Sequence, residues 1–294
     1  MAGWDEVLRE TQVTPGSYDV VRRKYLYKLS EYTHRNTIAY YSGFLTNGNH
    51  NNIDINDSDM TGFMNALTGV NTSNGLDLIL HTPGGNPMAA EAIISYLRNK
   101  FSNNIRVIVP QIAMSAGTMM ACAGKTIIMG KHSSLGPVDP QFNGTPAYEI
   151  IQMYNEARDN LKSDHPEVLY WRLVLERYVP AFMYTATSSI DLASELVRKW
   201  LGACMFDALA DAEKIENIVC QLNNHEDTKM HGRHFDVQKC REIGLNITDL
   251  ESDSELQDRV LSIHHAYMLT FNNTTAEKII ENHDGKAWIC NRRT

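Results

Sequence analysis

The fold is decided by residues 76–130, which read LDLILHTPGGNPMAAEAIISYLRNKFSNNIRVIVPQIAMSAGTMMACAGKTIIMG. Near-continuous apolar runs are typical of parallel strands covered on both faces, and they occur here at 76–81, 105–110 and 126–130. The intervening segments, 87–101 and 115–124, predict helices. Strands and helices that alternate in this way indicate right-handed βαβ units around a parallel sheet, so we expect an α/β fold.

The flanking sequence extends this pattern in both directions. Before it we expect an amphipathic helix at 18–32, a strand at 37–44 and a loop or helix-start region at 46–59. After it we expect mainly helices, at 146–163, 167–178, 189–201 and 211–222. A strand, helix and return strand then fit 234–247, followed by helices at 255–271 and 274–283 and a strand near 286–290. We therefore predict one domain over 1–294, with a sheet-rich part at 1–145, a helical elaboration at 146–230 and a closing βαβ unit with C-terminal helices at 231–294.

Composition narrows the class of protein. The 294 residues are 43% hydrophobic, which excludes a disordered chain, and the formal net charge of −8 disfavours nucleic acid as a partner. The five cysteines are scattered without a C-x-x-C pair, which is typical of a reducing compartment. No signal peptide is visible, and the longest uncharged stretch, 107–124, is too short and polar to span a membrane. We expect a soluble cytoplasmic protein without a membrane partner.

Two segments follow predicted strands at the edge where open parallel sheets bind ligands. The first is His81-Thr82-Pro83-Gly84-Gly85-Asn86-Pro87. Consecutive glycines allow positive φ and close backbone approach, so a glycine N–H can point at an anion. A tight strand-to-helix turn explains the same residues equally well.

The second segment is 113–118, in which Ser115 stands among small residues where a helix is about to begin. A nucleophile there gains exposed backbone N–H groups and the positive end of the helix dipole. A serine that merely caps the helix is the competing interpretation. Because both segments end neighbouring strands, together they would supply a nucleophile and a second N–H donor for an oxyanion, which favours the catalytic interpretation.

The motifs HTPGGN (81–86) and AMSAGTMMACAGKTIIMGKHSSLGPVDPQF (113–142) resemble the serine dehydrogenase proteinase family, a branch of the Clp-peptidase/crotonase superfamily related to signal peptide peptidase A. The resemblance continues through 22–29, 35–44, 231–245 and 279–288. It implies a fold of Clp-peptidase/crotonase-like stacked ββα units, here with a helical elaboration, that is commonly oligomeric. It also implies a serine peptidase with Ser115 as nucleophile and the N–H groups of Gly85 and Ala116 as the oxyanion hole.

The general base departs from the pattern of Clp-type peptidases. In these enzymes a histidine follows the nucleophile by about one helix and strand, and an aspartate comes later; here Asp139 occupies the first place and His231 the second. We expect His231 to take the Ser115 proton and Asp139 to orient its imidazole. Lys162 is the alternative base, because relatives of signal peptide peptidase A use a Ser–Lys pair, and His132 or His234 would be further candidates.

Other functions compete with peptide hydrolysis. A crotonase-type acyl-thioester enzyme uses the same N–H pair, but no basic cluster for a nucleotide phosphate accompanies the double glycine. A non-hydrolytic scaffold or binding member of the same fold is the other alternative. The histidines lack the i, i+4 pairing of a helical zinc site, so we expect no metal and no cofactor. The expected partners are a protein or peptide substrate and further copies of the chain.

Overall fold

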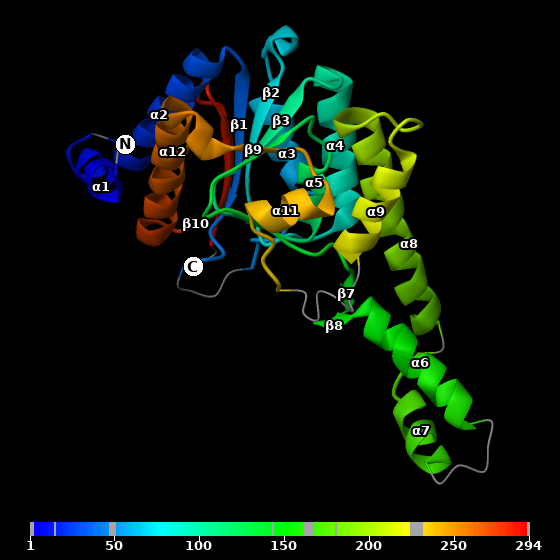
Figure 1. Ribbon diagram of the computed structural model, residues 1–294. Coiled ribbons are helices and arrows are strands. Elements are labelled where there is room, and N and C mark those ends of the chain that lie inside the picture. The colour runs from blue at the N-terminus through cyan, green and yellow to red at the C-terminus, as the bar shows by residue number, and fades with distance from the viewer. Residues whose placement is uncertain are drawn as a thin grey trace.

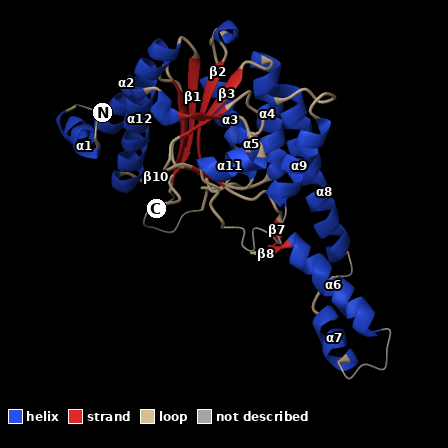
Figure 2. Cartoon of the chain, viewed as in Figure 1, coloured by secondary structure: helices blue, strands red, loops and turns tan. Residues whose placement is uncertain are grey.

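The computed structural model describes residues 3–14, 16–46, 51–142, 144–161, 167–179, 181–223 and 232–292. They form a mixed α/β fold around a mostly parallel sheet with the strand order β11-β10-β1-β2-β3-β5-β9 (Figures 1 and 2). The strands β1, β2, β3, β5 and β9 are parallel, whereas at one edge β10 pairs antiparallel with β1 and β11 pairs antiparallel with β10. The α/β class expected from the sequence is confirmed.

The elements follow one another as α1 (Trp4–Val13), α2 (Ser17–Thr33), β1 (Asn36–Ser42), α3 (Asp59–Ala66), η1 (Thr72–Asn74), β2 (Leu76–His81), α4 (Pro87–Phe101), β3 (Ile105–Val109), β4 (Ile112–Ala113), α5 (Ala116–Ala121), β5 (Ile127–Met129) and β6 (Ser134–Leu135). The second half comprises β7 (Gln141–Phe142), β8 (Thr145–Pro146), α6 (Ala147–Leu161), α7 (Val168–Leu175), α8 (Phe182–Trp200), the π-helix η2 (Leu201–Met205), α9 (Ala212–Asn223), α11 (Val237–Ile243), β9 (Ile247–Asp249), η3 (Leu250–Ser252), α12 (Ser254–Asn273), β10 (Ala276–Asn282) and β11 (Ala287–Asn291).

The sheet separates two hydrophobic cores, and successive strand residues alternate between them. In β1, Ile38 and Tyr40 contribute to the core under α3, α4 and α5, whereas Ala39 and Tyr41 contribute to the core under α2 and α12. Side chains of a strand point alternately to its two faces, so a strand buried on both faces must be apolar throughout. This requirement explains the continuous apolar runs of the sequence.

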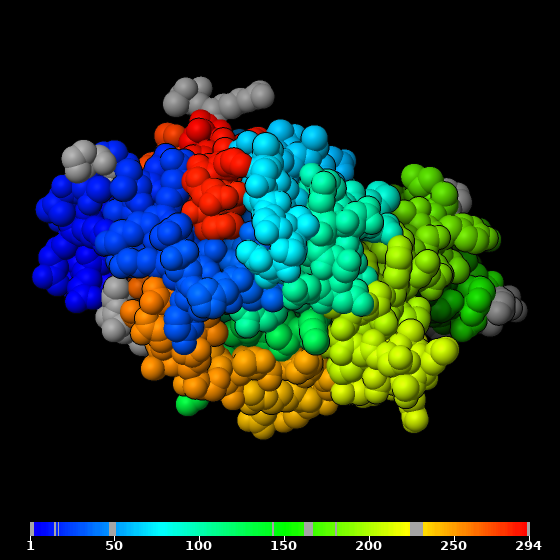
Figure 3. All heavy atoms as spheres, turned by 90° about the horizontal axis from the view of Figure 1, so that it is seen from above, coloured from blue at the N-terminus to red at the C-terminus, as the bar shows by residue number. Residues whose placement is uncertain are grey.

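One expected element has the wrong type. The sequence predicts a helix over 274–283, but residues Ala276–Asn282 form the strand β10, all seven of them buried. Alanine, glutamate and lysine at its start favour a helix. Pairing with β1 and β11 overrides that propensity, and Ile279 and Ile280 then enter opposite cores. In Figure 3 the C-terminal residues, in red, lie between the N-terminal residues, in blue, and the segment in cyan that follows the blue residues in the sequence.

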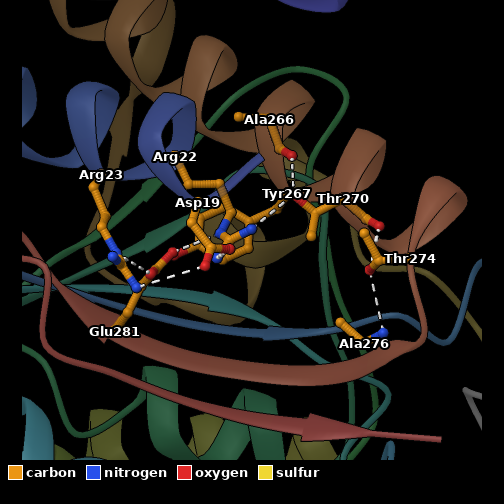
Figure 4. A network of polar contacts seen from close by, with 9 residues as sticks. All are labelled: Asp19, Arg22, Arg23, Ala266, Tyr267, Thr270, Thr274, Ala276 and Glu281. Carbon is orange, nitrogen blue, oxygen red and sulfur yellow. Dashed lines mark hydrogen bonds and ion pairs between the residues drawn. The ribbon is translucent and has the colours of Figure 1, made fainter. Parts of the chain in front are cut away.

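A buried polar network attaches β10 to the helices above it (Figure 4). The Arg22 guanidinium of α2 donates to Glu281 Oε1 at 2.7 Å and to Thr270 Oγ1 at 2.9 Å. The Tyr267 hydroxyl of α12 donates to the same Glu281 oxygen at 2.7 Å. Because each buried charge has partners, the network fixes α2 and α12 relative to the antiparallel edge of the sheet without leaving a charge unpaired.

The helices α6 and α7 extend away from the sheet, with α7 at the far end (Figure 1). At the base of this arm a small core joins α6 to α8 through Ala147, Ile150 and Ala186. None of the eight residues of α7 is buried, although its sequence VLYWRLVL is mostly apolar. Within the described ranges, none of the helices has the length and apolar character that a bilayer crossing requires.

Candidate active site

Two loops meet at the carboxyl ends of β2 and β3. The Thr82 amide donates to the Ile112 carbonyl at 3.0 Å, and the Met114 amide donates to the Thr82 carbonyl at 3.1 Å. These bonds extend the parallel pairing beyond the main sheet. They therefore bring the double-glycine loop beside the segment that contains Ser115, as the neighbouring strands predicted.

The orientation of the Gly84–Gly85 peptide follows from its hydrogen bond. The Gly84 carbonyl accepts a 2.7 Å bond from the Ile55 amide. Because C=O and N–H point in opposite directions across a trans peptide, the Gly85 N–H is directed away from Ile55. Gly85 lines the cavity that contains Ser115, and in the described part of the chain its amide donates to no other group. This amide is a free donor at the surface of the cavity.

Ser115 has an unusual backbone conformation. Its torsion angles are φ 50° and ψ −118°, and its side chain makes no capping hydrogen bond although it precedes α5. The capping interpretation of this serine is therefore wrong. Ser102 has a similar conformation at the exposed end of α4, so the torsion angles alone do not identify a nucleophile. Ser115 differs because its side chain adjoins a cavity and free amide groups.

The second free donor is the Ala116 amide. The Ser115 carbonyl accepts a 3.0 Å bond from the Met119 amide, which directs that carbonyl along α5 and the Ala116 N–H out of the helix start. The two loops are in close contact, because a Cβ added to Gly84 would lie 2.8 Å from Ser115 Cβ and 3.3 Å from the Ala116 nitrogen. Only glycine fits at this position.

A cavity of about 540 Å³ opens at these groups. This volume is within the usual range for ligand sites. The cavity is lined by Asp54, Pro83, Gly85, Pro87, Met88, Ser115, Ala116, Met119, Val138, Pro140, Gln141, Phe142, Ser189, Leu192 and Ala193. The three residues predicted as nucleophile and oxyanion hole are all among them, while the helical elaboration contributes one wall through α8.

The predicted base and its partner are only partly described. Asp139 is buried between two residues that line the cavity, and its Oδ2 accepts a 2.8 Å bond from Gln141 Nε2. His231 and Lys162 both lie outside the described residues. The assignment of Asp139 as the orienting group and of either residue as the base stays a prediction.

The structure does not bring the two further histidine candidates to Ser115. His234 is exposed, and its Nδ1 lies 2.7 Å from Ser134 Oγ. His132 lines a separate cavity of about 530 Å³ between α1 and α12, together with His264 and His265. Neither His132 nor His234 lines the Ser115 cavity.

Asp54 and Ile55 belong to the site although the sequence did not predict it, because the asparagines and aspartates around them indicate only a turn and a cap. The Ile55 carbonyl accepts a 2.8 Å bond from the Asn86 amide, so Ile55 holds the double-glycine loop from both sides. Below it, Lys278 Nζ donates to the Asp54 carbonyl at 2.6 Å and to Asp59 Oδ1 at 2.7 Å. The alternation of Asn, Ile, Asp and Ile at 52–55 was the available signal for an extended stretch.

Tyr40 completes this buried group. Its hydroxyl donates to Asp59 Oδ2 at 2.8 Å, and burial together with the Asp59 charge raises the pKa of Tyr40 well above its ordinary value. The phenol is therefore protonated at neutral pH and donates to the Asp59 carboxylate. Across the part of the chain that the structure describes, no three His, Cys, Asp or Glu side chains gather in a way that could hold a metal ion.

The fold and this constellation define a ClpP-like protein. The family model of the ClpP-like SDH-type serine proteinases matches residues 18–172, just over half of the sequence, so the chain belongs to that family. Among curated proteins it is similar to two uncharacterized proteins of Methanocaldococcus jannaschii. It is 29% identical to MJ1495 over 175 residues, 58% of this chain and 51% of that protein. It is 38% identical to MJ0137 over 117 residues, 40% of each chain. The matches thus cover about half or less of these relatives.

Proposed function

We propose that this protein is a serine peptidase that hydrolyses peptide bonds through an acyl-enzyme on Ser115, with the Gly85 and Ala116 amides as the oxyanion hole. The observation that carries the proposal is the coincidence of three features in one cavity. These are a serine hydroxyl without a capping bond and two backbone amides without acceptors among the described residues. Membership of a ClpP-like serine proteinase family supports the same assignment.

The proposed reaction has two stages. Ser115 Oγ attacks the scissile carbonyl carbon while the base takes its proton, and the oxyanion accepts hydrogen bonds from Gly85 and Ala116. The carbon–nitrogen bond then breaks as the base returns the proton to the leaving amine. In the second stage water attacks the ester, giving its proton to the base, and Ser115 is released with its hydrogen restored.

His231 is the base we propose, with Asp139 as its orienting group. The support comes from its described neighbours along the chain. The Phe235 amide and carbonyl both bond to Leu135, at 2.8 and 3.0 Å. A Cβ added to Gly136 would lie 3.6 Å from the Arg233 carbonyl oxygen and 2.3 Å from Cε of Met114, the residue before Ser115. Arg233, which follows His231 by two residues in the sequence, thus has its backbone close to the residue that precedes Ser115.

Lys162 is less well supported as a base in the same chain. In the sequence it follows the last residue of α6, a helix of 15 residues that extends away from the sheet (Figure 1). A helix of that length spans about 22 Å. The length of α6 does not argue against a base supplied by the lysine of a second copy of the chain.

A fluorophosphonate probe tests the proposed nucleophile. Wild-type protein is expected to be labelled on Ser115, as located by peptide mapping, and Ser115→Ala is expected to remain unlabelled. Ser102→Ala, which removes the serine of similar backbone conformation, is the matched control and should label at the wild-type rate. Equal labelling of wild type and Ser115→Ala would contradict the proposal, and an unlabelled wild type would favour a non-hydrolytic scaffold.

We also propose that the chain forms a homo-oligomer through the arm. On α7, Leu169, Tyr170 and Leu173 are 69%, 58% and 56% exposed. Clustered apolar side chains of this size on a projecting helix are typical of protein interfaces. A second copy of the chain is the occupant we propose, because the resemblance stated above is to a commonly oligomeric family.

A further inference from the structure

We propose that Asp54 makes this site selective for peptides that carry a lysine or arginine beside the scissile bond, with an uncharged apolar residue in the rest of the cavity. The inference rests on the proposed peptidase function and specifies its substrate class.

Asp54 carries the only ionisable side chain among the described residues that line the cavity. The residue is exposed, and in the described part of the chain its carboxylate has no hydrogen-bond or ion-pair partner. Its negative charge is therefore available to a ligand. A peptide ammonium or guanidinium group is the complementary group, whereas a glutamate or aspartate side chain would be repelled.

The backbone of Asp54 is held next to the oxyanion hole. Its carbonyl accepts from the buried Lys278 ammonium at 2.6 Å, and the next residue, Ile55, forms the parallel bridge to Gly85. Bridged residues on neighbouring strands lie about 5 Å apart. Since an extended peptide advances about 3.3 Å per residue, a cation bound at Asp54 belongs to a residue near the reacting carbonyl.

Lys278 does not neutralise the Asp54 carboxylate. The ammonium pairs with Asp59 Oδ1 at 2.7 Å, and both of those side chains are fully buried. The buried pair carries no net charge, so the charge of Asp54 remains uncompensated at the cavity rim. The net charge of −8 adds a long-range preference in the same direction, since a basic peptide is attracted to an acidic protein.

The other walls favour an apolar side chain. They consist mainly of Met88, Met119, Val138, Phe142, Leu192 and Ala193. Two methionines and a phenylalanine offer an adaptable apolar surface. A cavity of about 540 Å³ has room for a leucine or phenylalanine side chain together with a neighbouring residue that reaches the rim.

The experiment measures binding separately from catalysis. The probes are fluorescent peptides with one central leucine. In each peptide a single position, among the three on either side of the leucine, carries lysine, glutamine or glutamate. Their affinities for Ser115→Ala, which cannot cleave them, are measured by fluorescence anisotropy. At one position at least we expect lysine to bind about tenfold more tightly than glutamine, and glutamate more weakly, with the preference declining as salt is raised.

Variants of the rim then identify the residue responsible. Asp54→Asn in the Ser115→Ala background should remove the preference for lysine, and Asp54→Lys should reverse it toward glutamate. Asp57→Asn is the matched control, because Asp57 is exposed in the same loop and does not line the cavity. Absence of peptide binding, equal affinities for lysine, glutamine and glutamate at every position, or a preference that survives Asp54→Asn would overturn the inference. Fluorophosphonate labelling of wild type tests the peptidase proposal independently of all three results.

Discussion

Substitution of Gly85 by alanine tests whether its amide has the proposed oxyanion role or the double glycine serves only as a turn. A Cβ at Gly85 would lie 2.4 Å from the Ile55 nitrogen and 2.5 Å from the Ile55 oxygen. Ordinary contact requires about 3.4 Å, so the two backbones must separate by about 1 Å. The bonds from Ile55 to Gly84 at 2.7 Å and from Asn86 to Ile55 at 2.8 Å would then be too long.

The expected magnitudes follow from these contacts. Loss of two hydrogen bonds costs about 2 kcal/mol, and alanine at a positive φ costs about 1 kcal/mol more. We therefore expect Gly85→Ala to lower the free energy of unfolding by about 3 kcal/mol. Displacement of an oxyanion donor by about 1 Å is expected to slow acylation by about 100-fold.

Thermal unfolding followed by circular dichroism gives the stability, and the rate of fluorophosphonate labelling gives the reactivity of Ser115. The labelling is done well below the melting temperature, so that both proteins are folded. Gly16→Ala is the control, because Gly16 also has a positive φ of 71° but an added Cβ would only contact Val20 at 3.6 Å. The control should lose about 1 kcal/mol and label normally. Normal labelling of folded Gly85→Ala would refute the assignment of its amide as an oxyanion donor.

Three further predictions concern stability and assembly. Burial lowers the pKa of His81 from 6.5 to about 3, so the unfolded chain binds a proton first as the pH falls. Stability should therefore decline from pH 6.5 toward pH 3 by up to a few kcal/mol, and urea unfolding of His81→Phe should show a smaller decline. Lys278→Met leaves the buried Asp59 charge without its ion-pair partner and should lower the free energy of unfolding by about 3 kcal/mol. A second substitution, Asp59→Asn, should restore part of this loss, and no recovery in the double variant would contradict the pairing. On the arm, Leu173→Glu should lower the mass measured by light scattering, whereas Glu176→Gln should leave it unchanged.

The segment 76–130 could be predicted closely because its local signals agree with its tertiary environment. The strand at 76–81 and the helix at 87–101 have the bounds that the sequence indicated. In α4 the agreement has a local cause, since the Asn86 side chain accepts bonds from the Met88 and Ala89 amides and Pro87 occupies the first turn. The bounds of an element can be predicted from the sequence when the residues that determine them lie within the same segment.

Elements whose partners are distant in sequence were predicted less well. The strand β10 owes its conformation to β1, more than 200 residues earlier, and its own residues favour a helix. The helix α3 begins at Asp59, which agrees with the helix start expected as one of two possibilities for 46–59, but the pairing of Asp59 with the buried Lys278 ammonium could not be predicted locally. The role of Ser115 was also undecidable locally, since a capping serine and a nucleophile occupy the same place at a helix start. The missing capping bond excludes the capping interpretation, and the role of Ser115 as nucleophile stays a proposal.

The buried pair of Lys278 and Asp59 shows how the distant part of the chain takes part in the site. Such a pair adds little net stability compared with apolar residues of similar size, because desolvation offsets the attraction. Its directional bonds nevertheless specify one position for the Asp54 carbonyl, and through Ile55 one position for the Gly84–Gly85 peptide. An apolar replacement would fill the same volume without specifying where that peptide lies. The antiparallel strand that supplies Lys278 is thus part of the scaffold that aims the Gly85 amide, although it contributes no residue to the cavity wall in the described chain.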